Sequence, residues 1–457
     1  MSVVIGAVSQ IAPKKHRRVR RAHRLMSRRD GIPLGAFNGA HGAPCEIRRR
    51  ALQFAGMALG ALLVLPALAK DGDTFRPFVS YTRYYDSNLF RLAEGETTVV
   101  VENGVVVPVT RDAGSDQYGV LNAGLNMDWR PGRQSIQASA SKNLVRFSRF
   151  TSLDYDGSDY QLRWNWRLGN HWTGRIGATE SVTQTSFNDL SLGGGLQAIN
   201  NQVTRDNQFV SAEWQFHPRW NVGLGADGVT VSNSTTQQAP LDYEETSVSA
   251  SLGYTTPKGS QLRGQVRRAE GEYPNRLPGL SVERAYTQTE YNLLGDWNVA
   301  GKLVTRAKVG YVQRENDTAQ NGFSSLAGRL SADYVPTGKA LLNWAVYREL
   351  SNSDDLNASY QLNTGTSLGA SWLATSKVTL RASASFENRS FQNDTGLAQR
   401  DEDTLSGSLS LSYAPVRMAT IDVGLQAGRR ESNTDVVTVN DFSYSFHSVF
   451  VSMRAFF

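Results

Sequence analysis

From residue 115 onward the chain repeats one pattern, in which polar and apolar residues alternate up to an aromatic residue and a short turn follows. In residues 121–129 the odd positions are Leu, Ala, Leu, Met and Trp, and the even positions are Asn, Gly, Asn and Asp. Successive side chains of a β-strand point to opposite faces, so such a segment has one apolar wall and one polar wall. The repeat therefore predicts an all-β protein.

Eight short turns rich in Pro, Gly, Lys or Arg separate these segments, for example 130–133, 217–219 and 335–339. Successive turns stand about 40 residues apart, which is room for two strands, one tight turn and one longer polar loop. Short periplasmic turns and long extracellular loops are typical of a transmembrane antiparallel β-barrel. We expect eighteen strands: one near 74–84, two around each of the eight turns, and one at about 443–457. The alternative is sixteen strands, if 74–84 or the 350–373 region is misread.

The same period would also suit a soluble barrel or sandwich with its apolar face turned inward. Three features favour the membrane: many Ala and Gly on the apolar face, a polar opposite face in nearly every strand, and aromatic residues at the segment ends, as in interfacial girdles. The predicted girdle residues are Trp129, Trp166, Trp214, Tyr254, Trp297, Tyr334, Trp372 and Tyr413. At this strand number an aqueous channel is expected.

Residues 1–69 read as a basic extension followed by a secretory signal peptide with cleavage after Ala69, and residues 70–457 as the barrel. The apolar run 51–65 follows three arginines and is too short to span a membrane as a helix. The first 69 residues hold 12 Lys and Arg against two acidic residues. Since the whole chain has a net charge of +6, the predicted barrel has a net charge near −4. The negative charge of the barrel argues against a nucleic-acid partner. The single cysteine, Cys45, precedes the barrel, so no disulfide or cysteine metal site is expected there.

The polar face would line the lumen and carries charges of both signs. Clustered charge in a low-dielectric cleft concentrates counter-ions, so an anion-favouring constriction is predicted from Arg163, Arg175, Arg263, Arg267, Arg306, Lys308, Arg329 and Arg381. Four carboxylates that each directly precede a girdle aromatic predict an acidic periplasmic rim: Asp128, Glu213, Asp296 and Asp333. The alternative is that these charges pair across neighbouring strands and only keep the lumen wet.

The first long loop, residues 85–115, contains Asn103-Gly104 between two β-branched runs. Such a dipeptide is a strong signal for a two-residue hairpin turn. We expect an extracellular hairpin that extends the barrel wall, and the alternative is a loop that folds inward and constricts the pore.

No catalytic cluster, metal-ligand spacing or cofactor motif stands out, so an enzyme is not expected and neither is a cofactor. His171 and His217 fall in predicted tight turns. His447 falls on the predicted lipid side, where Ser445 or Ser443 could accompany it as in a lipid hydrolase, since a nucleophile and its base must lie within hydrogen-bond reach. A structural histidine at the membrane interface is the simpler interpretation.

The chain ends on Phe457, and Ala455, Met453, Val451 and Val449 precede it at alternate positions. This ending resembles the C-terminal signal of bacterial outer-membrane β-barrels. The resemblance implies Gram-negative outer-membrane localisation, outer-membrane lipids as surroundings, and recognition of Phe457 by the barrel-assembly machinery.

The opening segment 74–92 contains Arg76-Pro77 and the run Tyr85-Asp-Ser-Asn-Leu-Phe90. It resembles the β-barrel porin 2 family, in particular the EpsL-like outer-membrane proteins of exopolysaccharide biosynthesis and export. The resemblance implies a passive exit channel for an extracellular polysaccharide, with periplasmic export components as partners, and it supplies no catalytic residues. Two other functions stay open: a general small-solute diffusion porin, and a structural or polymer-binding barrel with a plugged lumen.

Overall fold

The computed structural model describes residues 74–187, 191–192, 195–276, 283–299, 301–317, 322–352, 358, 360–392, 400–433 and 442–457. The predicted extension, signal peptide and cleavage site lie outside these residues. No helix in the described part of the chain is long and apolar enough to cross a membrane.

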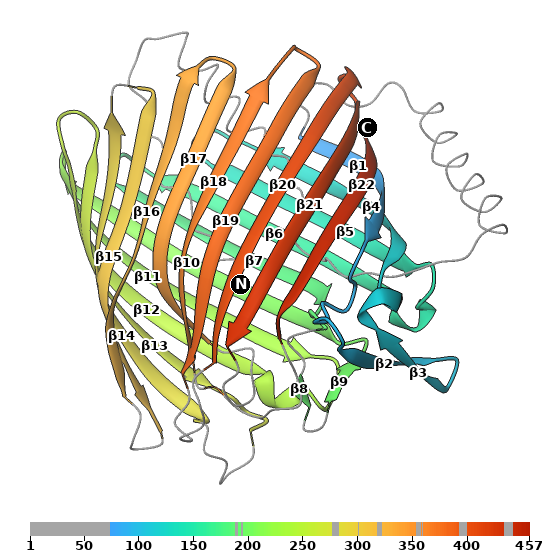
Figure 1. Ribbon diagram of the computed structural model, residues 1–457. Helices are drawn as coiled ribbons and strands as arrows, with labels where there is room; N and C mark the ends of the chain where they lie inside the picture. Colours follow the sequence, from blue (N-terminus) through green and yellow to red (C-terminus); the bar gives the residue numbers. More distant parts are fainter. Residues whose placement is uncertain are drawn as a thin grey trace.

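Eighteen strands form one antiparallel sheet that closes on itself (Figure 1). They are β1 (Phe75–Asp86), β4 (Asp116–Trp129), β5 (Ser135–Phe147), β6 (Tyr155–Leu168), β7 (Trp172–Gln184), β10 (Gln202–His217), β11 (Trp220–Asn233), β12 (Tyr243–Thr255), β13 (Gln261–Glu272), β14 (Ala285–Val299), β15 (Leu303–Asn316), β16 (Phe323–Thr337), β17 (Ala340–Asn352), β18 (Tyr360–Leu373), β19 (Val378–Gln392), β20 (Arg400–Val416), β21 (Ala419–Asn433) and β22 (Tyr444–Phe456). Closure comes from β1, which pairs with both β4 and β22. The predicted eighteen-stranded barrel is confirmed, and the sixteen-stranded alternative is wrong.

The eight predicted tight turns all lie at one end of the barrel, at the top in Figure 1. The chain end lies there too, because the Phe457 N–H donates to the Pro77 carbonyl oxygen over 2.9 Å. Short turns and chain termini mark the periplasmic end of bacterial barrels, so the long loops are extracellular.

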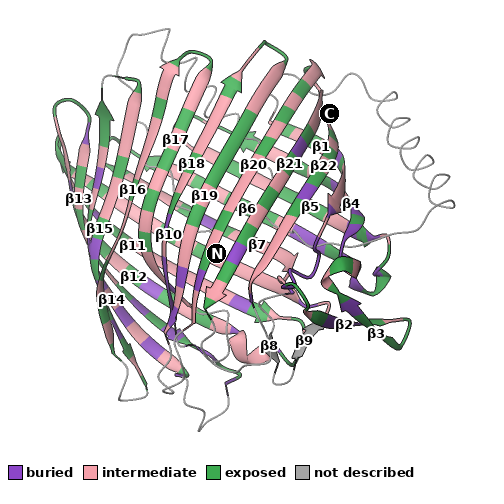
Figure 2. Ribbon diagram, viewed as in Figure 1, coloured by how far each residue is buried: buried purple, intermediate pink, exposed green. Residues whose placement is uncertain are grey.

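Large apolar side chains cover the outer face of the wall. Leu224, Leu326 and Leu405 are each exposed over more than half of their surface, at 64%, 65% and 59%, and Figure 2 shows exposed and intermediate residues alternating along the strands. A soluble protein rarely exposes apolar surface on this scale. The closed barrel with its apolar belt is therefore an outer-membrane barrel.

The eight predicted girdle aromatics all lie on this outer face, close to the periplasmic turns. Two of them pack against a neighbouring ring: Trp214 stacks on Trp172 at 5.8 Å between ring centroids, and Tyr254 lies 4.9 Å from Trp220. Amphipathic rings prefer the headgroup level of a bilayer. Their row marks the periplasmic edge of the membrane belt.

The predicted hairpin in the first long loop is confirmed, but its expected place in the wall is wrong. Strands β2 (Thr97–Glu102) and β3 (Val105–Thr110) pair with each other, and Asn103 and Gly104 between them have φ of 53° and 80°. They belong to a separate small sheet with β8 (Ser191–Leu192) and β9 (Gly195–Ala198). The wall closes through β1, β4 and β22 and has no open edge that the hairpin could extend.

The described residues of the extracellular end also contain three short 3-10 helices: η1 (Arg111–Ala113), η2 (Thr151–Leu153) and η3 (Ala239–Leu241). The loop that follows β13 packs against η3, where Arg276 Nε donates to the Pro240 carbonyl oxygen over 3.1 Å. The guanidinium also lies 3.5 Å above the Tyr273 ring, and burial lowers the pKa of Arg276 and raises that of Tyr273. The extracellular loops therefore fold onto one another.

Candidate functional site in the barrel lumen

All eight predicted lumen cations lie on the inner face, which the strand registers fix. Their cross-strand neighbours on that face include Gly177 for Arg163, Ser211 for Arg175 and Ser410 for Arg381. The guanidinium of Arg263 on β13 reaches Glu213 on β10, three strands away, at 3.0 Å. Two side chains three strands apart can meet at this distance only on the concave, lumen-facing side of the wall. The selectivity role of these residues stays a prediction.

Arg267 is the centre of an ion-pair network in the middle of the lumen. Its guanidinium contacts Glu245 at 2.7 Å, Glu290 at 3.1 Å and Asp227 at 3.3 Å. Glu290 also accepts from Lys308 Nζ at 3.1 Å, and its side chain is only 8% exposed. Two cations thus face three carboxylates, a formal net charge of −1, so this network offers no positive charge to a passing anion.

Two further carboxylates of the inner face are held, one by an ion pair and one by a hydrogen bond. Arg329 binds Glu349 at 2.7 Å, and the Tyr347 hydroxyl donates to Glu387 at 2.6 Å. The Arg329 guanidinium also lies over the Tyr347 ring at 4.4 Å. These contacts tie β16, β17 and β19 together on the inner face.

The four predicted rim carboxylates lie on the inner face near the periplasmic turns, and each is held by an arginine. Arg306 contacts Asp333 at 2.9 Å and Asp296 at 3.8 Å. Asp128 binds Arg130 of the following turn at 2.6 Å, and Glu213 binds Arg263 as described above. In the described part of the chain the rim carboxylates therefore do not stand apart from the basic residues, and the role of the rim stays a prediction. The pairing alternative describes these four carboxylates better, because acids and bases that share the inner face lie within side-chain reach across the strands.

Three predicted cations have no ion-pair partner among the described residues: Arg163, Arg175 and Arg381. Arg163 and Arg175 are diagonal neighbours on β6 and β7, because Gly177 faces Arg163 and Asn165 faces Arg175. Arg175 also interacts electrostatically with Arg163, Arg263 and Glu213. We call Arg163, Arg175 and Arg263 the arginine cluster. It holds three cations against the single carboxylate of Glu213.

The extracellular mouth is narrowed by residues 87–92, which we call the cap. Leu89, Phe90 and Leu92 are at most 1% exposed and form one apolar cluster with inner-face side chains that include Tyr118 and Phe147. The cap therefore lies against the inside of β4 and β5, so the inward-folding alternative for this loop applies to its first part.

A buried ion pair fixes the cap to the end of β1. Both Arg91 Nη atoms donate to Asp86, at 2.8 Å each, and the two side chains are 5% and 0% exposed. Asn88 connects the cap to β22, the strand that pairs with β1 where the barrel closes. Its Nδ2 donates to the carbonyl oxygens of Leu92 (2.9 Å) and Ser445 (3.0 Å). The run 85–90, noted above only for its family resemblance, is thus the anchor of this cap.

The histidines do not form a recognisable catalytic arrangement. His447 lies exposed on the outer face with its ring 6.2 Å from that of Tyr85. Ser445 Oγ accepts a hydrogen bond from Arg111 over 2.9 Å. His171 occupies a periplasmic turn as predicted, and His217 is the last residue of β10, next to the following turn. In the described part of the chain no three His, Cys, Asp or Glu side chains could hold a metal ion.

No family model matches the sequence, and no curated protein matches it either. Among solved structures, OpdK from Pseudomonas aeruginosa, an outer-membrane protein, is 12% identical with a TM-score of 0.43, covering 84% of this chain and 99% of its own. OccK2 (OpdF) from the same organism is 9% identical with a TM-score of 0.44, covering 84% and 98%. A mutant of the P. aeruginosa ferric enterobactin receptor PfeA is 8% identical with a TM-score of 0.40, covering 85% and 81%. At such low TM-scores the likeness carries no argument about function.

Proposed function

We propose that the chain is an outer-membrane diffusion channel for small hydrophilic solutes with a preference for anions. The observation that carries the proposal is the arginine cluster, where three inner-face cations share one carboxylate. Other inner-face cations, such as Arg267, Arg306 and Arg329, are neutralised by neighbouring carboxylates. The cluster is therefore a local excess of positive charge on a polar wall, and such a site raises the local concentration of anions.

Export of an exopolysaccharide is a second candidate, favoured by the resemblance of segment 74–92 to EpsL-like proteins. A polymer would need a continuous passage past the cap, whose apolar side chains are packed against the inner wall. A polymer and periplasmic export components would be partners only under this second function. The cap makes the small-solute channel the better-supported candidate.

Replacing Arg163 and Arg175 together by Gln should lower the anion selectivity of the channel. Neither guanidinium is in ion-pair contact with a described carboxylate, and Glu213 keeps its ion pair with Arg263, so the change removes two charges without leaving an acid unpaired. We expect the anion-to-cation permeability ratio to fall roughly two- to tenfold at about 0.01 M salt, and less at about 1 M, where screening is strong. Reversal potentials of the refolded barrel in planar bilayers measure this ratio.

Arg348→Gln is the matched control, because Arg348 lies on the outer face of β17 and should not affect the ratio. An unchanged ratio in the double variant would rule out the arginine cluster as the selective site. Adding acidic and neutral oligosaccharides to the same bilayers separates the two functions. One-sided block by an acidic oligosaccharide would favour polymer export, and indifference to sugars would favour the small-solute channel.

A further inference from the structure

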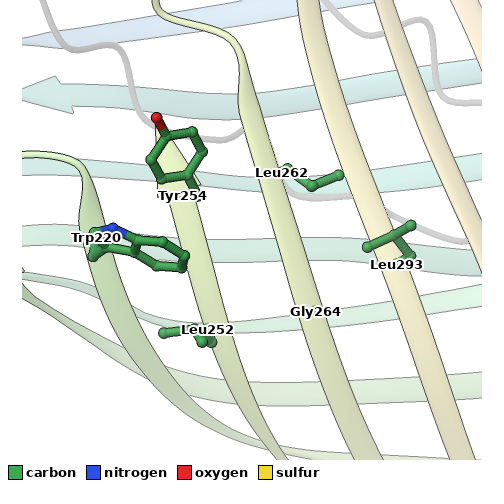
Figure 3. A pocket seen from close by; sticks show the side chains of 6 residues that line it. All are labelled: Trp220, Leu252, Tyr254, Leu262, Gly264 and Leu293. Atoms are coloured by element: carbon green, nitrogen blue, oxygen red, sulfur yellow. The ribbon is translucent and has the colours of Figure 1, made fainter. Parts of the chain in front are cut away.

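An apolar hollow lies on the outer wall near the periplasmic girdle (Figure 3). Its lining comes from four adjacent strands, β11 to β14, and consists of Trp220, Leu252, Tyr254, Leu262, Gly264 and Leu293. The leucines are about half exposed, at 48%, 41% and 53%. The volume is about 470 Å³, and a water takes up roughly 30 Å³, so the hollow has room for a chain of several methylene groups.

Gly264 forms the floor of the hollow. Two other outer-face glycines, Gly228 and Gly407, are also open, since a Cβ there would meet only one backbone oxygen, at 3.9 and 3.5 Å, but three differ from Gly264. A Cβ on Gly119 would meet the Tyr81 side chain, one on Gly174 would meet the Trp166 ring, and one on Gly295 would meet the Trp297 ring. At those three glycines the space that a side chain would take is therefore filled by an aromatic side chain of the wall itself. A Cβ on Gly264 would meet no atom within 4 Å. The nearby rings of Trp220 and Tyr254 pack against each other instead.

Two cations stand at the periplasmic edge of the hollow. Arg219 directly precedes Trp220 in one turn, and Lys258 lies in the turn after Tyr254; both are exposed. The Thr255 N–H donates to the Arg219 carbonyl oxygen over 2.7 Å, which holds the two turns side by side. Neither turn, 217–220 or 255–260, contains an acidic residue. Interfacial aromatics mark the headgroup level, so these cations lie where lipid phosphates lie.

We propose that this hollow binds one phospholipid of the periplasmic leaflet that carries a net negative headgroup. One acyl chain lies over Gly264 between the leucines, and the phosphate lies at Arg219 and Lys258. From the membrane interior to the periplasm, the apolar floor, the two aromatic rings and the two cations follow in the same order as the acyl chain, the interface and the headgroup of such a lipid. The site faces the bilayer, so it is independent of what passes through the lumen.

The test measures lipid retained by the full barrel in detergent, using native mass spectrometry with phosphatidylglycerol and phosphatidylethanolamine as probes. The native chain should retain phosphatidylglycerol in preference. Gly264→Leu should fill the hollow and lower the affinity for both lipids on the order of tenfold, the loss expected when about two methylene groups lose their apolar contact. Arg219→Gln with Lys258→Gln should remove the preference for phosphatidylglycerol and leave a weaker binding common to both lipids.

Ala384→Leu is the control, because it adds the same side chain to an exposed position on the outer face of β19. It should not change retention. Equal retention by the native chain and by Gly264→Leu would overturn the proposal. If Gly264→Leu instead abolished a dimer in the same spectra without changing lipid retention, the hollow would be a contact between two copies of the chain and the proposal would also fail. Unchanged heat stability of the variants shows that the barrel is intact.

Discussion

Replacing Asp86 by alanine should release the cap from the inner wall and raise the single-channel conductance. Asp86 and Arg91 form an ion pair with almost no exposure to solvent. Breaking such a pair by removing one partner costs about 3–5 kcal/mol, because the remaining buried charge loses its counter-ion. Arg91 would then favour solvent, and it would carry Leu89, Phe90 and Leu92 away from Tyr118. Planar-bilayer conductance and protease cleavage within residues 87–115 measure the release.

Glu102→Gln is the control on the same loop. Glu102 accepts hydrogen bonds from the Ser152 N–H and hydroxyl at an exposed site of the hairpin, so its loss should leave conductance unchanged. The double variant Asp86→Ala, Arg91→Ala should recover part of the lost stability, since it removes both charges. If Asp86→Ala kept the native conductance and the native resistance of the loop to protease, the ion pair would not be what holds the cap. No recovery in the double variant would argue against coupling between the two residues.

The architecture could be predicted from the sequence because the alternation of polar and apolar residues within each strand shows which side chains face the lumen and which face the membrane. The alternation in 121–129 and its repeats predicted eighteen strands, the tight turns and the outward position of aromatics such as Trp129 and Trp372. Every one of these properties is local in the chain. A period of two fixes which side chains share a face without any knowledge of the neighbouring strand.

The pairing of charges could not be predicted, because it depends on registers between strands that are distant in sequence. Arg263 meets Glu213 across three strands, and Arg267 meets Asp227 across two. A one-residue slip of any strand between them would move these groups apart. The predicted acidic rim stays a prediction: its four carboxylates lie at the periplasmic end as expected, but their arginine partners could not be identified from the sequence.

The cap was missed for a related reason. The run 85–90 contains the anchor, yet one of its partners, Ser445, stands 357 positions away in the sequence. The β-branched hairpin that follows predicts strands but does not say which sheet they join. Asn103-Gly104 determines the hairpin turn. The hairpin cannot join the barrel sheet, because the closed sheet has no free edge strand.

Deletion of Phe457 should abolish assembly in the outer membrane while leaving refolding in detergent nearly intact. In the structure the residue contributes a single backbone hydrogen bond to the closing seam, from its N–H to the Pro77 carbonyl oxygen. Such a bond contributes about 0.5–1.5 kcal/mol net, too little to unfold a closed barrel. The neighbouring Phe456, buried and packed 6.4 Å from Phe78, holds the seam in its place. A strong assembly defect must therefore come from recognition of the terminal aromatic during insertion.

Heat-modifiable mobility of the barrel in outer-membrane fractions, compared with that of the same variant refolded in detergent, measures the two effects separately. Phe457→Tyr should insert normally, because it keeps an aromatic ring at the terminus and the hydrogen bond to Pro77. Phe457→Ala keeps only the hydrogen bond and should fail to insert. If the deletion refolds poorly in detergent as well, the residue is structural and the seam depends on it. If the deletion assembles normally in cells, the resemblance of this terminus to an assembly signal is misleading, and closure through β1 and β22 is sufficient for insertion.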